Sequence, residues 1–336
     1  MKAVLLRGHG SFEQLEYRDD VPVPSPGAGE VLIRVAAAAV NNTDINTRIG
    51  WYAKSAADSG WSGRALHFPR IQGMDACGRI AAVGAGVDPK RTDARVLVDP
   101  LLPSRTSGAL CDYLGSERDG AFAEFLAVPA ENACDISSDL TDIELASFPC
   151  AYGTAENMLE RAQLRAGESV LVTGASGGVG SALVQLARRR GASVIAIAGR
   201  SKATAVQALG AATILDRESD LIAQLGRESV DVAVDVTGGG KFPQLLEVLK
   251  RRGRYAVAGA VAGPIVELDL RTLYLKDLRL FGCTVLEPGV FQRLIGYIER
   301  GEIKPLVSAT YPLSEIVAAQ KDFLARTHVG KIVLIP

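Results

Sequence analysis

The sequence lacks any apolar run near the roughly twenty residues that a membrane-spanning helix requires. Its start, MKAVLLRGHGS, also lacks the long apolar stretch of a secretory signal. Neither sign of charge is in excess, because 37 Lys and Arg face 38 Asp and Glu, for a formal net charge of -1. This balance argues against nucleic acid or an anionic membrane as the main partner. We therefore expect a cytoplasmic protein that acts on a small molecule.

Paired cysteines are also missing. The chain has five cysteines, an odd number, and no two of them are spaced as Cys-x-x-Cys. This pattern predicts reduced, mostly buried thiols and no disulfide framework. The five are Cys77, Cys111, Cys134, Cys150 and Cys283.

Apolar residues are present in the amount that a soluble two-domain protein needs: 48% of the 336 residues are hydrophobic and 22% are charged. Residues 1–150 are β-rich. From about Pro149, short apolar strands alternate with helical runs, which is typical of βαβ units and a parallel sheet. We expect an α/β fold with a β-rich domain over 1–150 and a nucleotide-binding domain over 151–285. The tail 286–336 is predicted to pack back onto the first domain.

The second domain is predicted to contain six strands, the number in a doubly wound dinucleotide-binding sheet. Helical runs such as Gly180–Arg190 separate the strands. The six predicted strands are Ser169–Thr173, Ser193–Ala198, Ala212–Leu215, Val230–Asp235, Arg254–Ala258 and Leu278–Phe281.

A glycine-rich stretch follows the first of these strands and begins a helix. Glycines at positions 174, 177 and 180 permit a tight turn and let backbone N–H groups approach a phosphate. The helix N-terminus presents the positive end of its dipole to a pyrophosphate. Glycine also serves ordinary turns, but the strand before, the helix after and the five further strands favour a dinucleotide loop. The predicted loop residues are Gly174, Ala175, Ser176, Gly177, Gly178 and Val179.

The end of the second strand indicates which dinucleotide binds. NAD sites usually have an Asp or Glu there for the ribose 2′-hydroxyl, and no acidic residue occurs from Ser169 to Leu215. The strand is followed instead by Gly199, Arg200, Ser201 and Lys202. The two cations can pair with a 2′-phosphate, and the serine can donate a hydrogen bond. We expect NADP(H); the alternative is a solvated basic turn.

Several motifs resemble the medium-chain dehydrogenase/reductases over nearly the whole chain. They are DGAFAEF at 119–125, Tyr152-Gly153-Thr154-Ala155 ahead of the glycine loop, and GKIVL at 330–334. The segment NNTDINTRIGWY at 41–52 is most similar to the quinone oxidoreductases. The resemblance implies that the first domain is a GroES-like catalytic domain completed by 286–336, that the second is a Rossmann domain, and that the protein is a homodimer. It also implies that Thr154 and Lys331 lie near the cofactor.

The resemblance also bears on metal binding. Zinc alcohol dehydrogenases of this fold have a catalytic Cys before Thr-Asp, a Gly-His-Glu and a second Cys. The equivalent places here look to be Asn41, Met74 with Asp75, and Cys150. An amide and a thioether do not replace the nitrogen and sulfur ligands of zinc, and the two remaining ligands seldom hold a metal. We expect no catalytic metal.

The structural zinc loop of those enzymes, with four cysteines, would fall in Ser104–Asp119, where only Cys111 is present. We expect this second metal site to be lost too. Without a Lewis acid, simple alcohol oxidation is disfavoured, whereas a quinone or an α,β-unsaturated carbonyl needs only orientation, hydrogen bonds and a proton.

Three side chains are candidates for the chemistry. Tyr52 is the first candidate for a hydrogen-bond donor or proton source; the alternative is an aromatic wall of the cleft. Thr43 is expected to contact the nicotinamide ribose or the substrate, because zinc relatives have a proton-relay hydroxyl there. Asn41 resembles a cleft residue, although an Asn41–Asp44 hydrogen bond that braces the loop would also explain it.

The predicted function is NADPH-dependent hydride transfer to a quinone or an α,β-unsaturated carbonyl without zinc. The alternatives are a zinc-type alcohol dehydrogenase and a non-catalytic NADPH-binding protein, since a fold alone does not establish catalysis. The stretch Ala53–Gln72 is longer than in a compact quinone oxidoreductase and is interpreted as a lid or a substrate-size filter.

Overall fold

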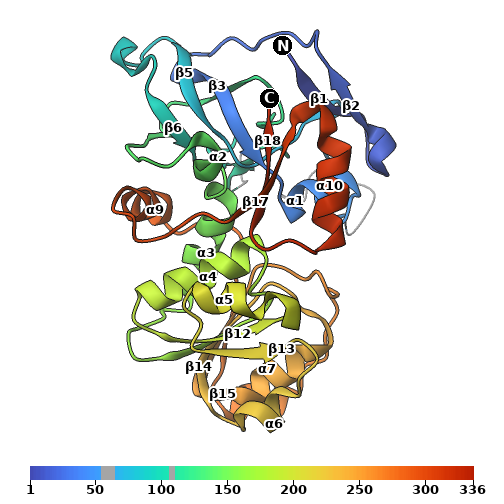
Figure 1. The fold of residues 1–336 in the computed structure, drawn as a ribbon, viewed down its shortest axis with the longest axis vertical. Helices are drawn as coiled ribbons and strands as arrows, with labels where there is room; N and C mark the ends of the chain where they lie inside the picture. The colour runs from blue at the N-terminus through green and yellow to red at the C-terminus, as the bar shows by residue number, and fades with distance from the viewer. Residues whose placement is uncertain (54–64, 106–109) are drawn as a thin grey trace. The chain divides into compact units, whose positions relative to one another are not determined.

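The computed structural model describes residues 1–53, 65–105 and 110–336. These residues form two compact units (Figure 1). Unit 1 contains Met1–Cys150 and Phe291–Pro336, and unit 2 contains Ala151–Val290. Most of the stretch interpreted as a lid or filter, residues 54–64, lies outside the described residues, as do residues 106–109 of the expected zinc-loop region.

Unit 1 is built on a seven-stranded sheet in the order β10-β6-β5-β3-β18-β17, with β9 also paired to β3. Its central strand β3 (Glu30–Ala39) has the sequence EVLIRVAAAA, whose β-branched and small apolar residues suit a buried strand. The other strands are β5 (Cys77–Val83), β6 (Arg95–Val98), β9 (Phe125–Pro129), β10 (Ala133–Asp135), β17 (Val307–Pro312) and β18 (Lys331–Ile335).

Two smaller sheets and several helices complete unit 1. One sheet has the order β2-β1-β4 and the other pairs β7 with β8. Helix α1 begins directly after β3, so the end of a buried strand determines where the helix starts. The bounds are β1 (Ala3–Leu6), β2 (Leu15–Arg18), β4 (Arg70–Ile71), β7 (Leu101–Leu102), β8 (Asp112–Tyr113), α1 (Asn42–Arg48), α2 (Asp142–Leu145), α9 (Val290–Glu299) and α10 (Ile316–Ala325).

The tail of the chain enters the sheet of unit 1. Strand β18 pairs antiparallel with the end of β3, where Val333 faces Ala39 and Leu334 faces Ala38. It also pairs parallel with β17 on its other side. Lys331, the first residue of β18, therefore comes close to the start of α1.

Unit 2 has the predicted doubly wound fold. All six strands are parallel, in the order β13-β12-β11-β14-β15-β16, as in dinucleotide-binding sheets. The strands are β11 (Ser169–Val172), β12 (Ser193–Ala198), β13 (Thr213–Asp216), β14 (Val230–Asp235), β15 (Leu249–Val257) and β16 (Arg279–Gly282). The helices are α3 (Pro149–Arg161), α4 (Gly178–Arg189), α5 (Ala203–Ala208), α6 (Leu221–Leu225), α7 (Phe242–Val248) and α8 (Leu270–Leu275).

Four of the six strands differ from the prediction at one or both ends, β11, β13 and β16 by one residue. Strand β15 begins at Leu249, before the predicted Arg254, and β13 ends at Asp216, one residue after the predicted Leu215. A charged residue in the sequence suggests a loop, but the register with β12 places Asp216 opposite Ala198 within the ladder. The difference places a carboxylate at the end of β13, within hydrogen-bond distance of Arg200.

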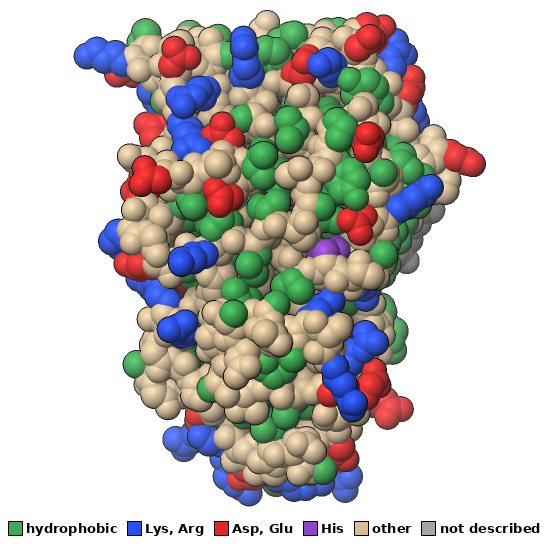
Figure 2. All heavy atoms as spheres, in the orientation of Figure 1, with side chains coloured by type: hydrophobic (Ala, Val, Ile, Leu, Met, Phe, Trp, Pro, Cys, Tyr) green, Lys and Arg blue, Asp and Glu red, His purple; other side chains and the backbone are tan. Residues whose placement is uncertain are grey.

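Among the described residues, none of the helices combines the length and apolar character needed to cross a bilayer. Basic and acidic side chains are interspersed over the face drawn in Figure 2.

Candidate functional site

The glycine loop of unit 2 has the geometry of a phosphate cradle. Gly174 has a positive φ of +57°, and Gly177 is the N-cap of α4. A Cβ on Gly180 would lie 2.0 Å from the Gly174 carbonyl oxygen, so no larger residue fits there. The first N–H groups of a helix have no partner within it and are free to bind an anion. The residues present therefore fit the pyrophosphate of a dinucleotide.

The basic turn that follows β12 forms a short 3-10 helix, Arg200–Lys202, with Gly199 as its N-cap. The Arg200 side chain is 91% exposed, and its Nε donates to Asp216 Oδ2 at 3.1 Å. Two hydrogen bonds lower the pKa of Asp216. The larger effect comes from the backbone N–H of Glu218, and a smaller one comes from the Arg200 side chain. Arg200 is thus held at the end of the sheet by a carboxylate.

Sequence reasoning missed Asp216 because the search for acidic residues ended at Leu215. Its position in the sequence, directly after the third predicted strand, could have indicated it. In a parallel sheet, the carboxyl ends of neighbouring strands meet at one edge. The end of the third strand therefore belongs to the same site as the end of the second. Thr154, the remaining predicted cofactor residue of unit 2, is half-buried in α3.

A second buried carboxylate in unit 2 was also missed. Asp235, at the end of β14, accepts hydrogen bonds from the Thr173 hydroxyl at 2.5 Å, from Thr237 and from the Gly238 N–H. Its other oxygen accepts from the Tyr255 hydroxyl at 2.6 Å. Burial raises the pKa of Tyr255, and the negative charge of Asp235 raises it further by a smaller amount. Asp235 thus fixes the loop after β14 at the carboxyl edge of the sheet, where folds of this kind bind ligands.

In unit 1, Asn41, Asp75 and Lys331 form a buried cluster. The Lys331 ammonium donates to Asp75 Oδ2 at 2.9 Å and to Asn41 Oδ1. The Asn41 amide donates to the same Asp75 oxygen at 2.9 Å, and the Cys150 backbone N–H donates to the other at 2.6 Å. The side chains of Lys331 and Asp75 are 4% and 0% exposed. Within unit 1, therefore, Lys331 binds protein groups.

Asn41 is also the N-cap residue of α1, and its backbone N–H donates to Asp44 Oδ2 at 2.8 Å. This is the bracing contact that sequence analysis gave as the alternative for Asn41. Burial, and to a lesser degree the negative charge of Asp75, raises the pKa of Asp44 to about 7.

The two predicted hydroxyl residues come together. The Tyr52 hydroxyl donates to Thr43 Oγ1 at 3.2 Å, and the Asn46 amide donates to the Tyr52 oxygen at 3.3 Å. Burial raises the pKa of Tyr52, an effect that the bonds to Thr43 and Asn46 partly offset. Asn46 was missed, although its position three residues after Thr43 places both on one face of α1.

Asn41, Met74 with Asp75, and Cys150 occupy the places that resemble the catalytic zinc positions. Throughout the described ranges, no three His, Cys, Asp or Glu side chains gather as they would to hold a metal ion. All five cysteines are described, and none of them forms a disulfide.

Comparisons with known proteins identify the family. An alcohol dehydrogenase GroES-like domain matches residues 27–138, and a zinc-binding dehydrogenase domain matches residues 178–300. Acryloyl-coenzyme A reductase of Metallosphaera sedula is 30% identical, over 99% of this chain and 99% of that protein. Quinone oxidoreductase of Rattus norvegicus is 30% identical, over 100% of this chain and 98% of its own length. A crystal structure of a provisionally named alcohol dehydrogenase from Sinorhizobium meliloti 1021 is 52% identical, with a TM-score of 0.95 over 100% of this chain and 96% of that one.

The chain belongs to the medium-chain dehydrogenase/reductase superfamily, as its motifs predicted. It is an oxidoreductase with a GroES-like domain and a Rossmann-like domain, and its relatives include quinone oxidoreductases.

Proposed function

We propose that the chain is an NADPH-dependent oxidoreductase that reduces a quinone or an α,β-unsaturated carbonyl compound without zinc. The observation that carries this proposal is the hydrogen bond between Tyr52 and Thr43, a residue of helix α1. The N-cap residue of that helix, Asn41, is bonded through its side chain to Asp75 and Lys331. This part of unit 1 offers a proton donor and an ammonium in place of metal ligands. Two relatives of 30% identity are named for acceptors of these two kinds.

Tyr52 is the proposed donor. Its raised pKa keeps the phenol protonated at neutral pH, which is the form that can donate. Thr43 and Asn46 hold the phenol oxygen in place by accepting from it and donating to it. The nicotinamide cofactor, when bound, supplies the hydride. The phenol then stabilises or protonates the oxygen that gains negative charge.

A zinc-type alcohol dehydrogenase is the second candidate, because one matching family model is described as a zinc-binding dehydrogenase, and another matching model and a similar crystal structure have alcohol dehydrogenase names. Three measurements decide between the quinone or enone reductase and the alcohol dehydrogenase. They are the rate of NADPH oxidation with quinones, enones and simple aldehydes, the metal content by elemental analysis, and the effect of a chelator on these rates. We expect chelator-treated protein to reduce quinones or enones. Stoichiometric zinc whose removal abolishes aldehyde reduction supports the alcohol dehydrogenase, and no oxidation with any acceptor supports a non-catalytic binder.

The proposed cofactor preference depends on the basic turn. NADPH is expected to bind at least tenfold more tightly than NADH, because one charge-assisted phosphate contact contributes about 1.5–3 kcal/mol. Arg200→Ala and Lys202→Ala should each weaken NADPH binding and leave NADH nearly unchanged. Calorimetric titration of both cofactors measures the ratio. Equal affinities in the unmodified protein would refute the preference.

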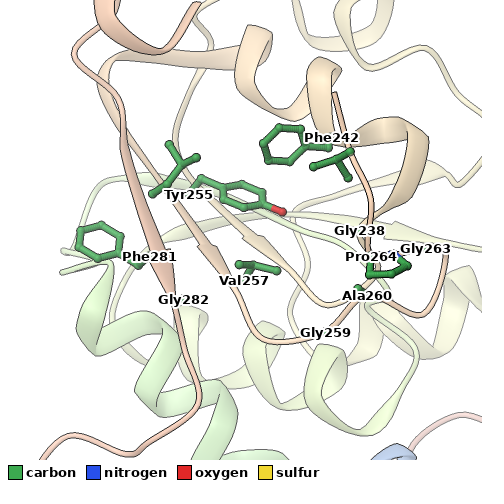
Figure 3. Close-up of a pocket in the computed structure, with 12 residues that line it drawn as sticks. Gly238, Phe242, Tyr255, Val257, Gly259, Ala260, Gly263, Pro264, Phe281 and Gly282 are labelled. Carbon is green, nitrogen blue, oxygen red and sulfur yellow. The ribbon is translucent and has the colours of Figure 1, made fainter. Parts of the chain in front are cut away.

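We also propose that the protein is a homodimer formed through unit 2. Strand β16 is the edge of the six-stranded sheet, so a second copy can extend the sheet with its own β16. Beside this edge lies an apolar pocket of about 250 Å³, lined by Val257, Phe281 and Pro264 among others (Figure 3). Large apolar side chains are also exposed within residues 265–280, as expected of a contact surface. They are Ile265, Leu270, Tyr274, Leu275 and Leu280.

A charge on this surface should separate the copies. Ile265 is 89% exposed, so Ile265→Glu leaves the monomer intact but buries an unpaired carboxylate in the dimer. We expect light scattering after gel filtration to show a dimer for the unmodified protein and a monomer for Ile265→Glu. Leu324→Glu, at an exposed leucine of α10 in unit 1, is the control that stays dimeric. A monomeric unmodified protein at micromolar concentration contradicts the dimer.

A further inference from the structure

The zinc that one family model's name implies does not fit the residues present. Asn41 uses its side-chain oxygen for Lys331 and its amide for Asp75 and the Ala39 carbonyl. Asp75 accepts hydrogen bonds on both of its oxygens. A metal ion there would have to displace an ammonium that is already paired with the buried Asp75 carboxylate.

The cluster joins segments that are distant in sequence. Lys331 begins β18, Asp75 precedes β5, and Asn41 lies between β3 and α1. The Cys150 N–H, at the start of α3, reaches the same carboxylate. The cation thus adds side-chain bonds where β18 already pairs with the end of β3 and β3 pairs with β5, and through Asp75 these bonds reach the start of α3.

The cluster also includes the residue at the start of α1. Asn41 is the N-cap residue of α1, and the helix carries Thr43 and Asn46, the two partners of Tyr52. The Asn41 side chain turns away from the helix toward Lys331 and Asp75. A shift of Asn41 would therefore be transmitted to the hydroxyl pair through less than one helical turn.

We infer that Lys331 is a positioning residue: its buried ammonium binds Asn41 and Asp75, which lie at places resembling the zinc-ligand positions of zinc alcohol dehydrogenases, and fixes the start of α1, and with it the Thr43–Tyr52 pair. This inference rests on the proposed function in one respect: the reaction whose rate Lys331 supports is the proposed one. It differs from the cofactor contact that the family resemblance implies for Lys331, and the two roles predict opposite results for cofactor affinity.

Lys331→Met removes the charge and keeps an unbranched apolar chain. We expect a lower kcat for enone reduction, by tenfold or more, with the NADPH Kd measured by calorimetry unchanged within about twofold. The melting temperature should fall by about 5 °C or more, because Asp75 is left buried and unpaired. Lys2→Met, which breaks the exposed Lys2–Glu124 pair, is the matched control that changes none of these values.

The double variant Lys331→Met with Asp75→Asn keeps the test decisive if the single variant folds poorly. It removes both charges, and the new amide oxygen can still accept the Cys150 N–H. We expect it to recover most of the lost melting temperature and to remain slow.

Three results overturn the inference. A tenfold weaker NADPH affinity in both variants makes Lys331 a cofactor ligand. Full kcat in the double variant makes the cluster merely structural. Stoichiometric zinc that stabilises the unmodified protein places a metal in the cluster. If the unmodified protein reduces no acceptor, the proposed function fails, and NADPH affinity together with metal content still decides the role of Lys331.

Discussion

Tyr52→Phe is expected to lower the rate of enone reduction by about 10²-fold, within the range that a general acid contributes. The variant keeps the aromatic ring and removes the hydroxyl that bonds to Thr43 and Asn46. A quinone should lose less rate, because its reduced oxygen is a weaker base that solvent can protonate. Steady-state kinetics with one acceptor of each kind measures the difference.

Two controls make the Tyr52 result interpretable. Tyr17→Phe removes an exposed hydroxyl of the same unit and should leave both rates unchanged. The NADPH Kd of Tyr52→Phe should also stay constant, because the glycine loop belongs to unit 2. If Tyr52→Phe reduces both acceptors at the unmodified rate, Tyr52 is only a wall, and Thr43 becomes the donor to test.

Gly180→Ala is expected to reduce NADPH affinity by at least 10²-fold. The added Cβ would lie 2.0 Å from the Gly174 carbonyl oxygen and 2.6 Å from its carbonyl carbon. Both neighbours are backbone atoms, so the loop must move away from the start of α4, and the cradle for the pyrophosphate is lost. Calorimetry measures the affinity, and circular dichroism establishes that the variant is folded.

Gly240→Ala is the matched control for this substitution. A Cβ at Gly240 meets no atom within 4 Å, so the same chemical change should leave folding and NADPH binding intact. A Gly180→Ala variant that binds NADPH as the unmodified protein does would show that the phosphates lie elsewhere.

The fold of unit 2 could be predicted because local signals agree there. Each short apolar strand is separated from the next by a helical run, and the glycine loop marks the turn after the first strand. The strand ends could not be predicted as well, because they depend on the register with the neighbouring strand. Asp216 belongs to β13 through its pairing opposite Ala198, which nothing in its own sequence neighbourhood reveals.

The candidate site of unit 1 could be predicted only in part. Tyr52 and Thr43 lie in one motif, so the family resemblance indicated both. Asn46 could have been predicted too, because it follows Thr43 by three residues in a helix. The partner of Lys331 was not predictable from local pattern, because 290 residues separate it from Asn41. The hydrogen bonds of such a residue are determined by the strand pairing that brings the two segments together.

The insertion of β18 beside β3 has a consequence for the order in which the protein is completed during synthesis. Unit 2 is continuous in sequence and can fold once residue 290 has been made. Unit 1 begins first but lacks β17, β18 and the Lys331 ammonium until residues 307–335 emerge. Until then, the end of β3 has an open edge at Ala38 and Ala39, and Asp75 lacks its cation. Residues 1–150 are therefore made before unit 2 but completed after it, and the edge of β3 is open to wrong strand pairing in the meantime.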